Sequence, residues 1–182
     1  MFEPVSALGH ASFDGFASIA EIGPVGMISL RATADVKGLA KAVKVVTGTA
    51  VPRLRQIVQA GGRAAGWMSP DEYLLILPYA DTAAAMVALD KALAGQHYLA
   101  VVVSDARAVF KISGDKADQI LAKLSPVDLA KLPIGEIRRT RTAQVAAAFW
   151  REEDGFTLVC FRSMADYVMG LLKHSALPGS EF

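Results

Sequence analysis

Hydrophobic and polar positions in this chain follow two periods, one typical of strands and the other of helices. Over residues 107–112 every second residue can face a core, whereas Ala117, Ile120, Leu121 and Leu124 recur at the spacing of one helical face. The break between them, residues 113–115 (Ser-Gly-Asp), supplies a helix start and an acid in the first turn. The pattern predicts a strand, a tight turn and a helix that packs back on its sheet.

The same two periods predict further elements on both sides of this stretch. Strands are expected at residues 17–22, 26–31, 64–68, 73–77, 98–103, 142–150 and 156–161, and helices are expected to begin at Asp35, Thr82 and Ser163. We expect Asp81 to cap the second of these helices, and the pair Ser163 and Asp166 to act as a capping box for the third. The run at 98–103, YLAVVV, is the most hydrophobic and predicts a strand covered on both faces.

An internal repeat relates the two halves of the chain. Trp67, an acidic turn, a strand and a helix are followed about eighty residues later by Trp150 and the same succession. Each half therefore reads β-α-β-β-α, and the second half lacks a strand after its last helix. We expect the early strand at 17–22 to supply it. The predicted fold class is α+β, with two interleaved ferredoxin-like halves.

The domain organisation follows from this repeat. Residues 1–16 have no sustained period and are expected to form an N-terminal arm that needs a surface to lie on. Residues 17–182 are expected to form a single domain, in which the two pseudo-repeat halves span 17–104 and 105–175.

Composition narrows the class of protein. Of the 182 residues 53% are hydrophobic, enough for one substantial core, and 19 basic residues nearly balance 18 acidic ones, so no basic surface for nucleic acid is indicated. We find no apolar run long enough to span a membrane and no secretory signal pattern. The single cysteine excludes an intramolecular disulfide and fits a reducing compartment. We therefore expect a soluble cytoplasmic protein without nucleic-acid or membrane partners.

Candidate catalytic and metal-binding residues are few. His10, His97 and His174 share no metal-ligand spacing, and Cys160 lies within an apolar strand, where a buried structural thiol is expected. The isolated glycines form no phosphate-binding loop, and the acidic clusters fall at hairpin tips, where charge is normally solvated. The sequence predicts no catalytic residue and no metal site.

A basic run is the one cluster with two open interpretations. It consists of Arg138, Arg139 and Arg141, with Arg151 beyond it. These residues either belong to a solvated edge strand, whose charges discourage aggregation, or form a contact face for the carboxylates of a partner or of a polyanionic tail such as polyglutamylated folate. Because residues two apart in a strand share a side, Arg139 and Arg141 are expected on one face and Arg138 on the other.

Four segments resemble a known protein family. They are residues 66–75 (GWMSPDEYLL), residues 103–107 with 112–114 (VSDAR and ISG), residues 125–129 (SPVDL) and residues 161–167 (FRSMADY). Together they resemble the gamma subunit of heterotetrameric sarcosine oxidase. More distantly, the strand-turn-helix at 107–124 is similar to the entry of the folate-binding domain of the glycine-cleavage aminomethyltransferase superfamily.

The resemblance implies a small, non-catalytic subunit that binds the alpha and beta subunits of sarcosine oxidase. The assembly would oxidatively demethylate sarcosine to glycine, with hydrogen peroxide and formaldehyde or methylenetetrahydrofolate as further products. FAD, FMN, NAD, zinc and tetrahydrofolate would then lie on other subunits, and none on this chain. The alternative is a stand-alone folate-binding, aminomethyltransferase-like protein. The Lys-Gly-Cys-x-x-Gly-Gln motif of the iron-sulfur-repair relatives in that superfamily is missing here.

Overall fold

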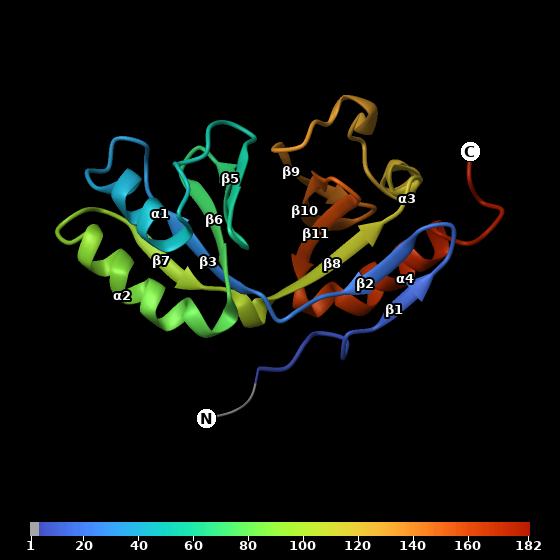
Figure 1. Cartoon of the computed structure of the whole chain (residues 1–182), viewed down its shortest axis with the longest axis horizontal. Helices are drawn as coiled ribbons and strands as arrows, with labels where there is room; N and C mark the ends of the chain where they lie inside the picture. The colour runs from blue at the N-terminus through green and yellow to red at the C-terminus, as the bar shows by residue number, and fades with distance from the viewer. Residues whose placement is uncertain (1–3) are drawn as a thin grey trace. The chain divides into compact units, whose positions relative to one another are not determined.

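The computed structural model describes residues 4–182 as a mixed α+β protein with two antiparallel sheets and, within those residues, four α-helices (Figure 1). The chain divides into two compact units. Unit 1 combines the N-terminal segment up to Pro24 with Asp105–Phe182, and unit 2 is Val25–Ser104. The coarse α+β prediction is therefore confirmed. No helix within residues 4–182 is long and apolar enough to cross a bilayer.

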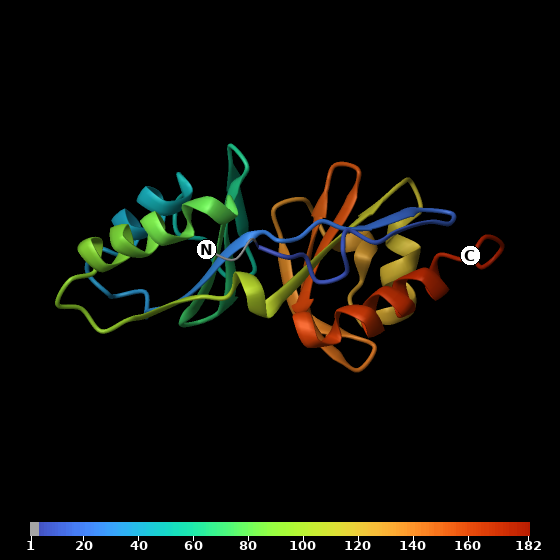
Figure 2. The same cartoon turned by 90° about the horizontal axis from the view of Figure 1, so that it is seen from below.

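Unit 2 is a five-stranded sheet with both of its helices on one face. Its elements are β3 Gly26–Arg31, α1 Leu39–Thr47, β4 Ile57–Ala60, β5 Arg63–Ser69, β6 Glu72–Leu77, α2 Thr82–Ala92 and β7 Leu99–Val102, and the strand order is β4-β5-β6-β3-β7. Alternate strand residues such as Ile28, Leu30 and Leu75 pack with the apolar faces of the helices. Figure 2 shows α1 and α2, in cyan and green, side by side.

Unit 1 is a six-stranded sheet built from both ends of the chain. Its elements are β1 Ser12–Asp14, β2 Ser18–Glu21, β8 Arg107–Ser113, α3 Ala117–Leu124, β9 Ile137–Thr142, β10 Val145–Glu152, β11 Gly155–Phe161 and α4 Ala165–Ser175, and the strand order is β1-β2-β8-β11-β10-β9. The predicted alternation in β8 is confirmed, since Ala108, Phe110 and Ile112 join the core beneath α3 and α4. That core includes the edge-to-face ring pair Phe149 and Phe156.

The early strand joins the sheet of the C-terminal half. β2 pairs antiparallel with β8, with Ile19 opposite Ile112, and Ile19 is fully buried. β1 then pairs with the outer edge of β2, with Phe13 opposite Ile19 and packed against the same core. The expectation that the strand at 17–22 pairs with the second half agrees with this topology.

A buried carboxylate ties the segment before β1 to β2. Glu21 accepts hydrogen bonds from the backbone N–H groups of Ala7 (3.3 Å), Leu8 (3.4 Å) and His10 (3.0 Å). Burial on its own raises the pKa of Glu21, but hydrogen bonds from Ser6, His10, Ala7 and Leu8 outweigh it and hold that pKa below its ordinary value. The ionised side chain thus organises the turn at residues 7–10.

The most hydrophobic run is not a strand covered on both faces, as the sequence predicted. β7 is the last strand of its sheet, and Leu99, Val101 and Val102 are 56%, 44% and 42% exposed. The prediction was wrong because hydrophobicity alone does not distinguish a central strand from an apolar edge strand.

α2 begins at Thr82 as predicted, whereas the starts of α1 and α4 and the predicted caps differ from the expectations. α1 begins at Leu39 rather than at Asp35, after Gly38, whose φ of 89° is left-handed and where a Cβ would lie 2.6 Å from the carbonyl oxygen of Ala92. Asp81 makes no cap hydrogen bond and pairs with Arg63 instead. No side chain caps α4, so the predicted capping box at 163–166 does not form.

The arginines of the basic run lie in a strand, which the sequence pattern alone leaves open. Residues 137–142 form β9, which makes a hairpin with β10 around Ala143, a residue with φ 50°. The turn lacks the Asn-Gly or Gly-rich signature by which such a hairpin is recognised from the sequence.

Candidate functional site

The basic run lies on β9, the strand that ends the sheet of unit 1. The register places Arg138 opposite Phe149, a core residue beneath the helices, whereas Arg139 and Arg141 lie opposite Ala148 and Ala146. Opposed residues in a ladder share a face. Arg139 and Arg141 therefore share the face away from the helices, and Arg138 lies on the other. Both residues of the outer pair are exposed.

Arg138 has a local structural partner. Its guanidinium Nη2 donates to Oε1 of Glu136 at 2.7 Å, and both side chains are largely covered. Its Nε is buried without a hydrogen-bond partner within residues 4–182. This arginine is held against its own strand.

Arg151 is tied to the loop between α3 and β9. Its Nε donates to the carbonyl oxygen of Leu132 at 2.8 Å, and its Nη2 donates to that of Leu129 at 2.7 Å. The guanidinium also lies over the ring of Phe156, 4.7 Å from its centre. Because Arg151 is opposite Phe156 in the sheet, it faces the helices, and the structure does not bring it together with Arg139 and Arg141.

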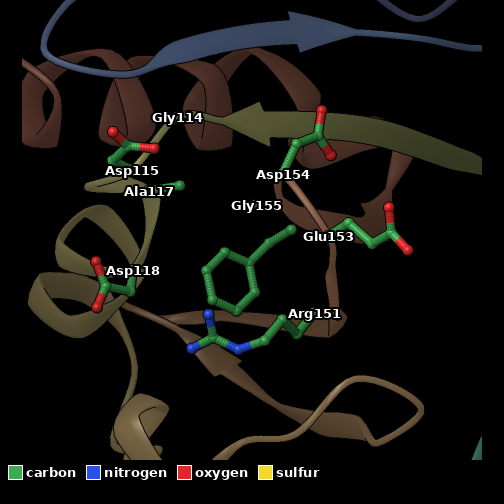
Figure 3. A pocket seen from close by; sticks show the side chains of 9 residues that line it. Gly114, Asp115, Ala117, Asp118, Arg151, Glu153, Asp154 and Gly155 are labelled. Carbon is green, nitrogen blue, oxygen red and sulfur yellow. The ribbon is translucent and has the colours of Figure 1, made fainter.

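A small cavity opens beside Arg151 at the start of α3. It has a volume of about 210 Å³ and is lined by Gly114, Asp115, Ala117, Asp118, Arg151, Glu153, Asp154, Gly155 and Phe156 (Figure 3). Asp154 forms an ion pair with Lys111 at 2.9 Å, and the hydrogen bond from Lys111 lowers the pKa of Asp154. No group of three or more His, Cys, Asp or Glu residues within 4–182 is placed to hold a metal ion.

Cys160 lies in the core of unit 1. Burial raises the pKa of its thiol to about 11, although the charge of Arg107 acts in the opposite direction. The group is therefore a thiol at neutral pH, and a thiolate nucleophile is not available there.

Trp150 is buried as well. Its indole N–H donates a hydrogen bond to Oε1 of Glu152 at 2.6 Å, so this ring is part of the local packing.

Sequence reasoning missed one surface. The exposed apolar side chains of β7 form a strip along the open edge of unit 2, and no motif marks them as different from a buried strand. The sequence does contain one signal that would have predicted this exposure. The run directly follows the last helix of a β-α-β-β-α succession, and in a ferredoxin-like fold the strand at that point is an edge strand.

Comparison with known proteins decides the family. The sarcosine oxidase gamma subunit family matches residues 31–177. The chain belongs to that family. The gamma subunit of sarcosine oxidase from an Arthrobacter species is 30% identical over 151 residues, which cover 80% of this chain and 72% of the relative.

Two solved structures share the fold of this chain. A chain of the heterotetrameric sarcosine oxidase from Corynebacterium sp. U-96, in complex with pyrrole 2-carboxylate, superposes with a TM-score of 0.80 at 23% identity, covering 91% of this chain and 87% of that one. The glycine cleavage system aminomethyltransferase T from Bartonella henselae gives 0.63 at 14% identity, covering 84% of this chain and 44% of that one. The expected likeness in fold is thereby confirmed for aminomethyltransferase T.

Proposed function

We propose that this chain is the gamma subunit of a heterotetrameric sarcosine oxidase and contributes binding surfaces to the assembly rather than catalytic groups. The family match over residues 31–177 carries this proposal. The likeness to a chain of a solved heterotetrameric sarcosine oxidase supports it. The other subunits, alpha and beta among them, would be its partners, and the cytoplasm its compartment.

The local chemistry supports a non-catalytic role. Cys160 holds its proton at neutral pH, and Arg151 and Arg138 are engaged with the chain's own carbonyls and carboxylate. We propose that FAD, FMN, NAD, zinc and tetrahydrofolate bind to other subunits. The assembly would oxidise the N-methyl group of sarcosine, leaving glycine, with hydrogen peroxide and formaldehyde or methylenetetrahydrofolate as further products.

We also propose that the two units are ferredoxin-like pseudo-repeats, and that β2, from before the first repeat, completes the second. In each unit the order of pairing is the same, since β2-β8-β11-β10-β9 corresponds to β7-β3-β6-β5-β4. The matching aromatics support the alignment, because Phe156 lies opposite Ile112 and Tyr73 lies opposite Leu30. Unit 1 takes its β2 from the N-terminus, so the halves are interleaved along a single domain, with residues 1–16 as the arm.

Purification of the chain alone and with the other subunits tests the assignment. Alone it should show neither flavin absorbance nor sarcosine-dependent hydrogen peroxide. Mixed with the remaining subunits it should form one assembly. Turnover by the isolated chain, or no assembly, would contradict the proposal.

A stand-alone folate-binding protein is the second candidate, favoured by the fold likeness to aminomethyltransferase T. Calorimetry with tetrahydrofolate decides between the two. Binding with a dissociation constant near micromolar, about −8 kcal/mol, would support the second candidate. Absence of heat well above that concentration would leave the subunit role.

Arg139 and Arg141 are proposed as one contact with an acidic surface of a partner subunit. The double change Arg139→Glu and Arg141→Glu would oppose like charges, which costs several kcal/mol at an interface. Its effect on folding should stay within about ±0.5 kcal/mol, because both residues are exposed. Lys41→Glu with Lys91→Glu, on the exposed surfaces of α1 and α2, makes the same change of net charge and serves as the control. Normal assembly of the arginine variant would leave these residues as solvated edge charges.

A further inference from the structure

β7 presents an open hydrogen-bonding edge. It pairs with β3 alone among the described residues, and the strand order ends there. The N–H of Val103 donates to the carbonyl oxygen of Met27 at 2.8 Å. Because an antiparallel ladder alternates, the N–H and C=O groups of Leu99 and Val101 face β3 as well. Those of Ala100 and Val102 therefore point outward, in position to pair with another strand.

The side chains of β7 make this edge apolar on both faces. Val102 lies opposite the core residue Ile28 and so faces the helices, whereas Leu99 and Val101 lie opposite Arg31 and Ser29 on the other face. All three are more than two-fifths exposed. Edge strands are normally blunted by a charged residue, a proline or a bulge, and Leu99–Val102 contains none of these.

β2 of unit 1 shows how a strand in the same topological position is closed. Both strands pair with the strand that leads into the first helix of their unit. The two strands can be aligned because Ile112 of β8, opposite Ile19, corresponds to Leu30 of β3, opposite Ala100. In this alignment the residues of β2 and β7 correspond as Ser18 with Leu99, Ile19 with Ala100, Ala20 with Val101 and Glu21 with Val102. In unit 1, β1 pairs with the outer edge of β2, and within residues 4–182 no strand does so for β7.

The contacts of β1 indicate the chemistry of a strand that would fit β7. β1 runs antiparallel to β2 and places Phe13 opposite Ile19, on the core side. At β7 the corresponding residue is the small Ala100, which leaves more room for a large apolar side chain. On the outer face β2 has Ser18 and Ala20, opposite the exposed Asp14 and Ser12, whereas β7 has Leu99 and Val101. An apolar residue is therefore favoured on that face too.

We propose that β7 is a strand-addition site, at which an extended, uncharged and apolar segment of another subunit of the sarcosine oxidase assembly pairs antiparallel with Leu99–Val102. This inference rests on the proposed function, because only an assembly of different subunits contains another chain that could provide the segment. Backbone pairing at Ala100 and Val102 gives the segment its direction, and the three exposed side chains select an apolar sequence. Such a site explains why this edge lacks the charged residue, proline or bulge by which a monomeric protein would be expected to protect it.

Lysine substitution on this edge is the direct test. The full chain carrying Leu99→Lys and Val101→Lys is titrated against the remaining subunits, and the dissociation constant is compared with that of the wild type. We expect binding at least tenfold weaker, because charged edge residues oppose strand pairing. The control is Val45→Lys with Leu54→Lys, which places two charges at exposed apolar positions of the same unit away from β7. It should change binding less than twofold.

The possible outcomes separate the two proposals. Unchanged binding of the β7 variant, with wild-type folding in both proteins, would overturn strand addition and leave the subunit assignment intact. Failure of the wild type itself to bind the other subunits would overturn both. A wild-type homodimer that the β7 lysines dissociate would also overturn the proposal, because the occupant would then be a second copy of the chain. Melting curves of the isolated variants establish that they fold.

Discussion

β2 and β7 have the same place in their sheets and opposite surroundings. β2 is enclosed by β8 and β1, its Ile19 is fully buried, and its Glu21 binds the turn before β1. β7 has β3 on one side and, within the described residues, no strand on the other. Within the described residues, the chain therefore closes only one of these two equivalent edges itself. It leaves the other apolar and available to a partner.

Removal of residues 1–24 should have the largest effect, because it deletes both β1 and β2. Burial of one large aliphatic side chain contributes roughly 1.5–3 kcal/mol, and domains are stable by only roughly 5–15 kcal/mol. We expect unit 1 to lose its cooperative unfolding transition. Circular dichroism and amide exchange of the truncated chain measure this. A persistent transition with protected amides in β8 would mean that β2 contributes little to the sheet.

Single substitutions in β2 and β7 compare how much each strand contributes to the stability of the isolated chain. Ile19→Ala removes a fully buried side chain and should cost about 2–5 kcal/mol of unfolding free energy, whereas Val101→Ala on β7 should stay within about ±0.5 kcal/mol. Urea denaturation of the two isolated variants provides the measurement. Similar losses would show that β7 is as well covered in the isolated chain as β2.

Glu21→Gln should produce a smaller loss that depends on pH. Hydrogen bonds to a charged group contribute about 1.5–3 kcal/mol, and the amide keeps only part of this. Because the folded-state pKa lies below the ordinary value of 4.5, the ionised group stabilises the fold fully above that pH, and the contribution is lost as pH falls through the folded-state pKa.

The difference in stability between wild type and Glu21→Gln should therefore shrink on acidification below about pH 4.5. Taking the difference removes the contributions of the other carboxylates, whose titration both proteins share. A difference that is independent of pH would show that Glu21 does not bind the N-terminal turn through its charge. No group in β7 titrates in this range, so that edge should not respond.

Much of this fold could be predicted from the sequence because its elements have strong periods. The alternation over 107–112 and the helical spacing from Ala117 to Leu124 correspond to β8 and α3, and the missing fourth strand of the second half pointed to the N-terminus. Features set by tertiary context could not be predicted. The turn at Ala143 has no sequence signature of a turn. Asp81 forms an ion pair with Arg63 and makes no cap hydrogen bond to α2.

The arginines show how much of the candidate site could be predicted from the sequence. The strand period predicted correctly that Arg139 and Arg141 share a face and that Arg138 does not. It could not predict that Arg151 donates to the carbonyls of Leu129 and Leu132, because that loop follows no period. Whether the outer pair binds a partner stays a prediction. The exposure of β7 was missed, since its composition is that of a buried strand.

Amide hydrogen exchange on the wild-type chain, isolated and within the assembly, tests the contrast between the two edges most directly. In the isolated chain, the outward amides of Ala100 and Val102 should exchange freely, while β2 should already be protected between β1 and β8. On assembly with the other subunits, the two β7 amides should slow by at least about tenfold, and β2 should change little. Equal exchange of Ala100 and Val102 in the isolated and assembled chain would contradict the account.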